Sequence, residues 1–520
     1  TAEPTVTYSP GTILFESNIL VTLPHQTDHI VISEVAVGIG SAGNEFIELY
    51  NPTDNDIDLS NFNLKLIDSD DVISTKTITW TNNVIPSEGF FLFAAGDVGL
   101  TADATFSTQM TDTSGVIITD ENDVVIDKVA WGATPPSNGV ETTGVTQTLS
   151  TDESIERKTG EIPSEEVYGN GQDTDDNSYD FFVQDTPNPQ NSDSCRELPG
   201  TIVVETENCE HTTIQSAIDD ANSGDEIEVT GTYTEDLTIN KPLYVEGFGA
   251  TLNGVHTITA EEVTIDSFTL NPDGGIGITI DSSASALGDI EILNNIFDLT
   301  TGNPIGILLG GYTTPQKVSD IVIDNNIFNG PDDKNCNPWK IGGWFGNPVG
   351  VSVNDVYFED NDVNKCSIPI NLHDQNIEDI LIDGNIFRDT DGVVYVWEDA
   401  GENPTGILSG FVFTDNDVDS SNSYGIGIDT ASPPVFTDAN FGTGIDISNN
   451  NFRGIPGAYG FDAVSILSDL TTYKLIAENN WWGDTSGPTH SDNLGGSGDS
   501  VSDNVDFDPW LTRPIEFASI

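Results

Sequence analysis

A short pattern of the form apolar-x-apolar-x-x-Asn-x-apolar occurs seven times in the second half of the chain. The copies read IEILNNIF, IVIDNNIF, VYFEDNDV, ILIDGNIF, FVFTDNDV, IDISNNNF and LIAENNWW. Their aligned asparagines are Asn295, Asn326, Asn361, Asn385, Asn416, Asn450 and Asn480. The intervals run from 24 residues, between Asn361 and Asn385, to 35 residues, between Asn326 and Asn361. Repeats of this period are typical of solenoids, in which stacked repeats bury a common core.

Each copy predicts one coil of a parallel β-helix, with short strands joined by tight turns. If the seven asparagines occupy the same turn, their side-chain amides stack into a ladder in which each amide bonds to a neighbouring coil. Such a ladder satisfies polar groups that are buried. Asparagine also tolerates the left-handed backbone conformation of tight corners. The unequal intervals predict loops of different lengths between the strands.

The segment TIQSAIDDANSGDEIEV, which precedes the repeats, predicts a helix. Ile214, Ala217, Ile218 and Ala221 have helical spacing, and Gly224 can end the helix. This segment and the asparagine repeats resemble right-handed parallel β-helix proteins of the pectate-lyase-like class, across about residues 195–508. The resemblance implies that the helix is the N-terminal cap of the solenoid.

The first part of the chain has short apolar runs of period two, separated by Gly, Pro, Asn and Asp. Many short strands with turn signals predict a β-sandwich. The segments ISEV, NEFIELYNPT, IDLSNFNL, IPSEGFFLF, DKVAWG, SIERK and DTDDNSYDFFVQDTPNPQN follow the order seen in lamin-tail domains. This resemblance spans about residues 28–192 and implies an immunoglobulin-like fold. Secreted prokaryotic members resemble accessory or adhesive modules, although a fold does not determine a role.

The segment DTPNPQNSDSC, residues 185–195, is predicted to be a linker, because polar turn-forming residues crowd together and no apolar periodicity persists. The predicted fold class is all-β: an immunoglobulin-like β-sandwich followed by a right-handed parallel β-helix with one N-terminal capping helix. The predicted divisions are a strand-forming arm at 1–27, the sandwich at 28–192, a linker with the first solenoid strand at 193–212, the β-helix at 213–508 and a tail at 509–520.

The chain is strongly acidic, with 86 acidic residues, 15 basic residues and a formal net charge of -71. Phosphate binding needs clustered Lys and Arg, so nucleic acid is excluded as a partner class, and anionic membrane surfaces are disfavoured. Two explanations of the charge stay open and can coexist. One is a solvated surface adapted to salt or to an extracellular setting, and the other is a set of carboxylates that bind divalent cations.

The four cysteines are Cys195, Cys209, Cys336 and Cys366, and no CxxC pair occurs. Zinc and thioredoxin chemistry are therefore disfavoured. An even count in an exported chain predicts two disulfides. We favour Cys195–Cys209 and Cys336–Cys366, because each pair lies within one local segment. Four buried free thiols are the alternative.

An extracellular or cell-surface location is expected. The chain begins with Thr1 rather than Met, which suggests that a signal peptide has been removed. No run approaches the ~20 apolar residues of a membrane helix, so insertion into a membrane is not expected.

A complete catalytic constellation is not found in the sequence. Lyases of this shape need a basic residue, and hydrolases need two neighbouring carboxylates, but no Arg-x-Lys pair and no Gly-His-Gly occurs. The sequence NLHDQN, around His373 and Asp374, is the strongest acid–base candidate, with an exposed turn as the alternative. Carboxylates two residues before the ladder position predict a row along one solenoid face, formed by Asp324, Glu359, Asp383 and Glu478. A solvated face is favoured there over a catalytic groove, so the chain is not expected to be an enzyme.

The loop GQDTDDNSYD is a candidate metal site. It places Asp173, Asp175, Asn177 and Asp180 in one short, oxygen-rich turn of the kind that Ca²⁺ prefers. The spacing is not that of an EF-hand. A turn held by Asx hydrogen bonds is the alternative. Ca²⁺ is the one cofactor that the sequence suggests.

The sequence ENNWWGDTSGPTH marks the end of the solenoid. In the seventh copy, Leu475, Ala477 and Trp482 take the apolar positions, so Trp482 is expected to point inward and close the core. The stretch resembles a terminal NNWWG…GPT signature of secreted β-helix proteins. The predicted cap consists of Trp481, Trp482 and Trp510, with Trp510 laid over the end.

Two functions stay open at this stage. The first is a secreted structural protein that assembles with copies of itself into a filament, surface layer or sheath, through the arm at 1–27 or a C-terminal strand. The second is an extracellular polysaccharide-binding or polysaccharide-cleaving protein, with Trp339, Trp344 and Trp397 as candidate sugar contacts.

Overall fold

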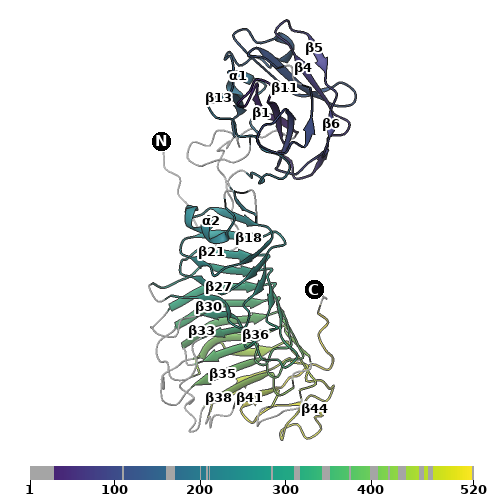
Figure 1. Ribbon diagram of the computed structural model, residues 1–520. Helices are drawn as coiled ribbons and strands as arrows, with labels where there is room; N and C mark the ends of the chain where they lie inside the picture. The colour runs from purple at the N-terminus through teal and green to yellow at the C-terminus, as the bar shows by residue number, and fades with distance from the viewer. Residues whose placement is uncertain are drawn as a thin grey trace, which may run out of the picture. The chain divides into compact units, whose positions relative to one another are not determined.

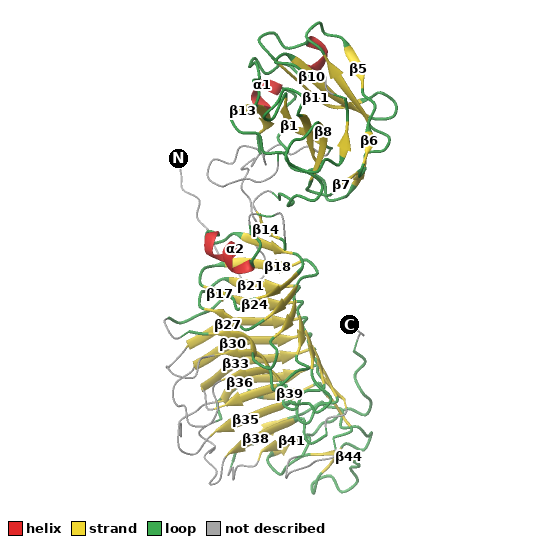
Figure 2. Ribbon diagram, viewed as in Figure 1, coloured by secondary structure: helices red, strands yellow, loops and turns green. Residues whose placement is uncertain are grey.

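The chain divides into two compact units, Thr1–Pro199 and Gly200–Ile520. Each unit is described by itself, and Figures 1 and 2 show their strands. The computed structural model describes residues 29–107, 110–159, 170–198, 201–206, 209, 211–282, 285–309, 317–341, 352–373, 376–398, 408–419, 422–430, 441–455, 462–466 and 472–517. The predicted arm at 1–27 therefore lies outside the described residues.

The first unit is a β-sandwich built from two main sheets. The larger sheet has the strand order β13 (Phe181–Gln184), β12 (Ser154–Arg157), β1 (Val31–Ala36), β2 (Glu45–Tyr50), β8 (Phe90–Ala95), β9 (Ala104–Thr105) and β6 (Thr79–Trp80). The smaller sheet has the order β11 (Val125–Trp131), β10 (Ser114–Thr119), β4 (Asn63–Ile67) and β5 (Ile73–Thr75). A two-stranded ribbon pairs β3 (Ile57–Asp58) with β7 (Val84–Ile85), and the short helices are η1 (Ser137–Gly139) and α1 (Asn177–Asp180).

The core of the sandwich forms where the inward positions of both sheets meet. Ile32, Ile47, Phe91, Val116 and Trp131 belong to one buried apolar cluster that spans the sheets. Alternation with period two places such residues on one face of each strand, which is why the sequence pattern predicted a sandwich.

Residues 188–197 pack against the sandwich instead of leaving it as a free linker. The Tyr50 hydroxyl donates to the backbone oxygen of Glu197 at 2.6 Å, and Asn191 Nδ2 donates to the backbone oxygen of Thr101 at 2.9 Å. These hydrogen bonds hold part of the predicted linker to the sandwich, and the division itself stays a prediction. The segment's polar side chains lack apolar periodicity because they bind polar groups of the sandwich.

The second unit is a parallel β-helix whose described strands form three sheets. Sheet I consists of β14 (Thr201–Val204), β15 (Glu226–Val229), β18 (Leu243–Gly247), β21 (Val263–Asp266), β24 (Ile290–Leu293), β27 (Lys317–Asp324), β30 (Ser352–Glu359), β33 (Asn376–Asp383), β36 (Leu408–Thr414), β39 (Asp446–Ser448), β42 (Leu475–Ile476) and β45 (Val505–Asp506). Sheet II consists of β16 (Thr232–Thr234), β19 (Thr251–Asn253), β22 (Thr269–Asn271), β25 (Ile296–Asp298), β28 (Ile327–Asn329), β31 (Asp362–Asn364), β34 (Ile386–Arg388), β37 (Asp417–Asp419) and β40 (Asn451–Arg453). Sheet III consists of β17 (Thr238–Ile239), β20 (His256–Ile258), β23 (Ile276–Ile280), β26 (Ile305–Leu309), β29 (Asn337–Ile341), β32 (Ile370–His373), β35 (Val394–Glu398), β38 (Ile426–Thr430) and β41 (Val464–Ile466). The ribbon β43 (Pro488–Thr489) with β44 (Gly498–Ser500) lies outside these sheets.

Helix α2 (Ile214–Asp220) covers the beginning of the solenoid core. Its N-cap is Thr213, whose side chain accepts from the backbone N–H of Ser216, and its residues Ile214, Ala217 and Ile218 are buried in the solenoid cluster. The apolar stripe predicted from the spacing is thus the face that closes the first coils. Among the described residues, no helix has the length and apolar composition needed to cross a membrane.

The seven aligned asparagines are fully buried and form a continuous hydrogen-bonded ladder. Asn361 illustrates the geometry: its Oδ1 accepts from the backbone N–H of Asn326 at 2.9 Å and from Asn326 Nδ2 at 3.1 Å. Its own Nδ2 donates to the backbone oxygen of Ile323 and to Asn385 Oδ1. The same contacts recur from Asn295 to Asn480.

Each ladder asparagine follows a residue in the left-handed backbone region. The φ angles are 55° at Asn294, 55° at Asn325, 49° at Asp360, 70° at Gly384, 51° at Asp415, 60° at Asn449 and 57° at Asn479. Asn, Asp and Gly adopt this conformation most readily, which explains why those three types occupy the corner. At Gly384 a side chain would also collide, since an added Cβ would lie 2.3 Å from Asp360 Oδ1.

The far end of the solenoid is closed by aromatic side chains. Trp482 is fully buried and stacks on Phe452, with ring centroids 5.0 Å apart and an interplanar angle of 11°. Trp481 is 8% exposed, and Trp510 packs against the same core cluster from outside. The backbone N–H of Leu511, next to Trp510, donates to the backbone oxygen of Asn480 at 2.9 Å, which fixes the covering segment to the last ladder residue.

All four cysteines are disulfide-bonded, and none is free. Cys336 is joined to Cys366, with Cα atoms 5.0 Å apart. Cys195 and Cys209 are also disulfide-bonded. Disulfides persist in oxidising compartments, which fits a location outside the cytosol.

Replacing Asn361 with Ala is expected to lower the free energy of unfolding by about 2–4 kcal/mol, because two donors of Asn326 lose a buried acceptor. Urea unfolding measures the change. Asn364→Ala, at a half-buried position of the same coil, is the control and should change the midpoint little. Equal midpoints for the two variants would contradict a stabilising ladder.

Candidate functional site: the outer face of sheet I

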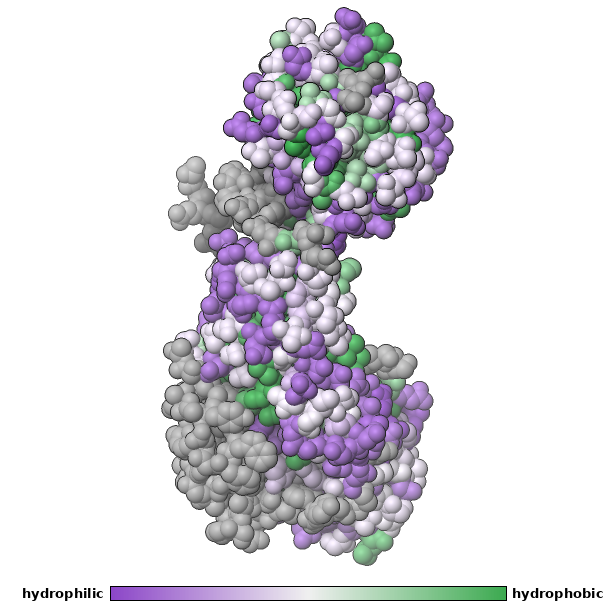
Figure 3. Space-filling view, viewed as in Figure 1, coloured by the Kyte–Doolittle hydropathy of each residue, from purple (hydrophilic) through white to green (hydrophobic). Residues whose placement is uncertain are grey.

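The outer face of sheet I carries an apolar strip that runs across four neighbouring coils. Val322, Tyr357, Leu381 and Val412 are paired in strict register on β27, β30, β33 and β36. Each lies between two buried residues of its strand, so its side chain points away from the core. Tyr357 is 36% exposed. In Figure 3 hydrophilic residues predominate on the visible face of this unit, with a small hydrophobic area among them.

Two rows of carboxylates flank the strip. Asp324, Glu359 and Asp383 are in register on one side, where the sequence predicted a row. On the other side, Asp320, Asp355 and Asp379 take equivalent positions, all with φ between 53° and 55°. The strand pairing skips Asp320 and Asp355 and resumes in the same register at Ile321 and Val356. Neighbouring strands lie ~4.8 Å apart, and the two rows are separated by roughly 13 Å along the strand.

Glu478 does not extend the row that the sequence predicted. It lies in the turn after β42, and Thr414 and Ser448 occupy the row position in the intervening coils. The acidic row therefore spans three adjacent coils and not the whole solenoid.

Mutual repulsion and burial raise the pKa values along this face. Burial, then Asp383 and Asp324, raise the pKa of Glu359. Burial and then Asp415 raise the pKa of Asp383. The pKa of the Tyr357 hydroxyl is raised by burial and by Asp355, Asp320, Glu359 and Asp379. Because both rows contribute at Tyr357, its hydroxyl lies within the electrostatic field of both.

None of the six row carboxylates is paired with a basic side chain in the part of the chain that the structure describes. Three basic residues of the solenoid, Arg388, Arg453 and Lys340, lie on its other two sheets. Arg388 pairs with Asp362 and Arg453 with Asp417, both on sheet II. Lys340, on sheet III, is buried, and burial lowers its pKa. His373 ends β32, opposite Trp397 of β35, and Asp374 lies outside the described residues.

Of the three aromatic residues predicted to contact sugar, Trp339 is placed in the core. Trp339 is fully buried and stacks on Phe358 with ring centroids 5.5 Å apart, because its position on β29 faces the core. That expectation is corrected. Trp344 lies outside the described residues, and Trp397 lies in β35.

The structure does not bring the predicted calcium ligands into one set. Asp173 lies 3.7 Å from Arg157 Nη1 and 3.6 Å from His29 Nε2, while Asp180 accepts from the backbone N–H and the hydroxyl of Thr174. The buried amide of Asn177 donates to the backbone oxygen of Lys128 and to Glu141.

The fourth predicted ligand, Asp175, takes a left-handed conformation and donates its N–H to Asp173. Within the described residues, no three carboxylates of the loop bring oxygens within 4.8 Å of one another. The loop thus has the Asx-type hydrogen bonds of the alternative interpretation, and calcium binding stays a prediction.

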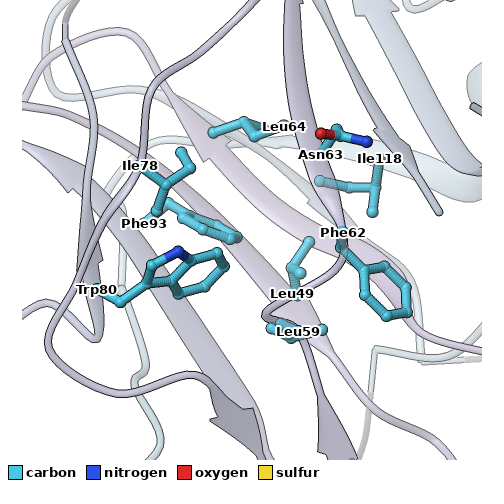
Figure 4. Close-up of a pocket in the computed structure, with 9 residues that line it drawn as sticks. All are labelled: Leu49, Leu59, Phe62, Asn63, Leu64, Ile78, Trp80, Phe93 and Ile118. Carbon is cyan, nitrogen blue, oxygen red and sulfur yellow. The ribbon is translucent and has the colours of Figure 1, made fainter. Parts of the chain in front are cut away.

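A hollow in the sandwich is a second candidate site (Figure 4). It is lined by Leu49, Leu59, Phe62, Asn63, Leu64, Ile78, Trp80, Phe93 and Ile118. The one polar lining residue, Asn63, donates its amide to the backbone oxygen of Asp120. Ligand sites combine apolar walls with a few convergent polar groups, which this hollow lacks.

A row of three glutamates in the sandwich, of which Glu34 and Glu48 are buried and Glu156 is half-buried, was not predicted from the sequence. Glu156, Glu34 and Glu48 are directly opposite one another on β12, β1 and β2. Burial raises the pKa of Glu34 to about 7 and that of Glu48 well above its usual range. The backbone N–H groups of Asn188 and Gln190 donate to this pair. The detectable signal was one Glu in each of the strand segments ISEV, FIEL and SIER.

Taken together, the fold defines a two-part all-β protein: an immunoglobulin-like sandwich and a parallel β-helix. Residues 24–133 match the family model of the Lamin Tail Domain. The match ends before β12 and β13, which complete the larger sheet.

A search of curated proteins gives no match. Among solved structures, the chain is similar to a mannuronic acid specific polysaccharide family 6 lyase from human gut microbiota. The identity is 12%, with 51% of this chain and 76% of that chain covered and a TM-score of 0.28.

The chain is also similar to the catalytic domain of a GH87 alpha-1,3-glucanase in complex with nigerose. The identity is 12%, with 82% of this chain and 89% of that chain covered and a TM-score of 0.28. A complex of that catalytic domain with tetrasaccharides gives 10% identity, 93% and 95% coverage and a TM-score of 0.30.

Glu34→Gln is expected to raise the free energy of unfolding by about 1–3 kcal/mol at pH 8 and by less at pH 5. The carboxyl titrates near ~4.3 when unfolded and at about 7 when folded. The folded chain therefore holds more protons in this window, and its stability falls as the pH rises. The remaining Oε1 can still accept from Ser154 and Asn188.

Urea unfolding at the two pH values measures this change, with exposed Glu121→Gln as the control. A gain at pH 5 as large as that at pH 8 would contradict the assignment of a raised pKa.

Proposed function

We propose that the protein is an extracellular polysaccharide-binding protein that holds a linear polymer along the outer face of sheet I. The observation that carries this proposal is the strip of Val322, Tyr357, Leu381 and Val412 in coil register between two rows of carboxylates. A polymer aligned with the solenoid meets a similar surface at the three successive coils that carry β27, β30 and β33.

The chemistry of the face suits a sugar chain. The apolar faces of sugar rings pack on aromatic and aliphatic side chains, and the phenol of Tyr357 adds a polar group at the same place. The carboxylates on either side are strong acceptors for sugar hydroxyls. Pockets that combine apolar area with a few polar groups are the usual form of ligand sites, and this face is the extended equivalent.

Assembly into a filament, surface layer or sheath stays a prediction. The arm at 1–27, one of its two predicted contacts, lies outside the described residues. In the C-terminal tail, Ile515 accepts from and donates to the side-chain amide of Asn451 in the same chain, at 2.9 and 2.8 Å. A C-terminal strand donated to a neighbour would have to leave these bonds.

The test is a panel of soluble polysaccharides, with binding measured by calorimetry and cleavage by released reducing ends. Tyr357→Ala should weaken binding by roughly tenfold, as expected for the loss of about 1.4 kcal/mol. Tyr179→Ala is the matched control, because Tyr179 is 45% exposed on the other unit. Silence across the panel, or unchanged binding by Tyr357→Ala, would refute the proposal.

A further inference from the structure

We infer that the polymer bound on sheet I carries protonated amino groups, as an amino-sugar polysaccharide with free amines does. This inference rests on the proposed function and specifies its ligand class. It follows from the charge of the face and from the position of that charge beside the apolar strip.

The strands that form the centre of the face are almost free of positive charge. Strands β27, β30, β33 and β36 carry one basic residue, Lys317, which is the first residue of β27. Their carboxylates are Asp320, Asp324, Asp355, Glu359, Glu378, Asp379 and Asp383. The corner next to them adds Asp360 and Asp415.

Like charges directly opposite on neighbouring strands destabilise a sheet. Asp324, Glu359 and Asp383 lie opposite one another without a basic partner among the described residues. An ammonium group placed between two of them would replace repulsion with attraction. A ligand that supplies one such group after another along its length therefore gains at each coil.

The arrangement of the rows indicates an extended partner with an apolar side. The strip of Val322, Tyr357 and Leu381 lies between the rows, so a ring packed on Tyr357 has carboxylates on both flanks. A uronic acid polymer would be repelled from this place, and a neutral polymer would leave the charges uncompensated.

Bound divalent cations fit this face less well than amines do. In the described part of the chain, these carboxylates do not form a group of three with oxygens within 4.8 Å of one another. An ammonium group needs no such convergence, because it interacts with one or two carboxylates at a time.

The experiment compares, with the full chain, a glucosamine polymer, its fully N-acetylated form of equal length, a neutral glucan and a polyuronate. We expect the free amine form to bind at least tenfold more tightly than the acetylated form and to weaken as salt rises. The double variant Glu359→Gln with Asp383→Asn should lose at least tenfold for the amine form alone. Asp70→Asn with Glu121→Gln makes the same charge change at exposed sandwich positions and is the control.

The outcomes separate the inference from the proposed function. Equal affinity for the amine and acetylated forms, with both dependent on Tyr357, would overturn the inference and leave the proposed function standing. Binding of polylysine as tight as that of the glucosamine polymer, and unaffected by Tyr357→Ala, would show a merely anionic face and overturn both. Silence toward all four polysaccharides would also overturn both.

Discussion

The hydrogen bonds between successive ladder asparagines determine how the coils align, and the surface depends on that alignment. Each Oδ1 accepts from the backbone N–H and from the Nδ2 of the preceding asparagine, as Asn361 does with Asn326. The left-handed residue just before each asparagine turns the chain at the same place in every coil. The residues two and four positions before each ladder asparagine therefore lie at the same place in successive coils, and their side chains form straight rows on the outer face of sheet I.

Acidic residues are accommodated in two different ways in the two units. In the sandwich, Glu34 and Glu48 are buried, burial raises their pKa values, and both accept from backbone donors, those of Asn188 and Gln190. On sheet I the carboxylates are only partly buried, and their repulsion is relieved by no basic residue that the structure describes. The first arrangement fixes residues 188–197 to the sandwich, and the second leaves a surface that favours a cationic partner.

The fold class could be predicted because both units repeat a simple pattern. Seven copies of one coil motif and seven ordered strand segments each specified an architecture, and the spacing of Ile214, Ala217 and Ile218 located the capping helix. The row of Asp324, Glu359 and Asp383 could also be predicted from the sequence, because its members stand at a fixed distance from the ladder asparagines.

The apolar strip could not be predicted from the sequence, because Val322 and Leu381 resemble core residues until the strand pairing shows which face they occupy. The second row depends on a left-handed position at Asp320, Asp355 and Asp379, which disturbs the alternation. Burial of Trp339 was missed for a similar reason: it is a core position within a segment that reads as a loop.

The central claim is that a polymer lies between the two carboxylate rows of sheet I. Covalent labelling of carboxylates with a carbodiimide and an amine, followed by mass spectrometry, reports on each acid separately. With a saturating glucosamine polymer, labelling of Asp324, Glu359, Asp355 and Asp379 should fall together, while labelling of Asp70 on the sandwich stays constant. Unchanged labelling of the four residues while the polymer is bound would contradict the account.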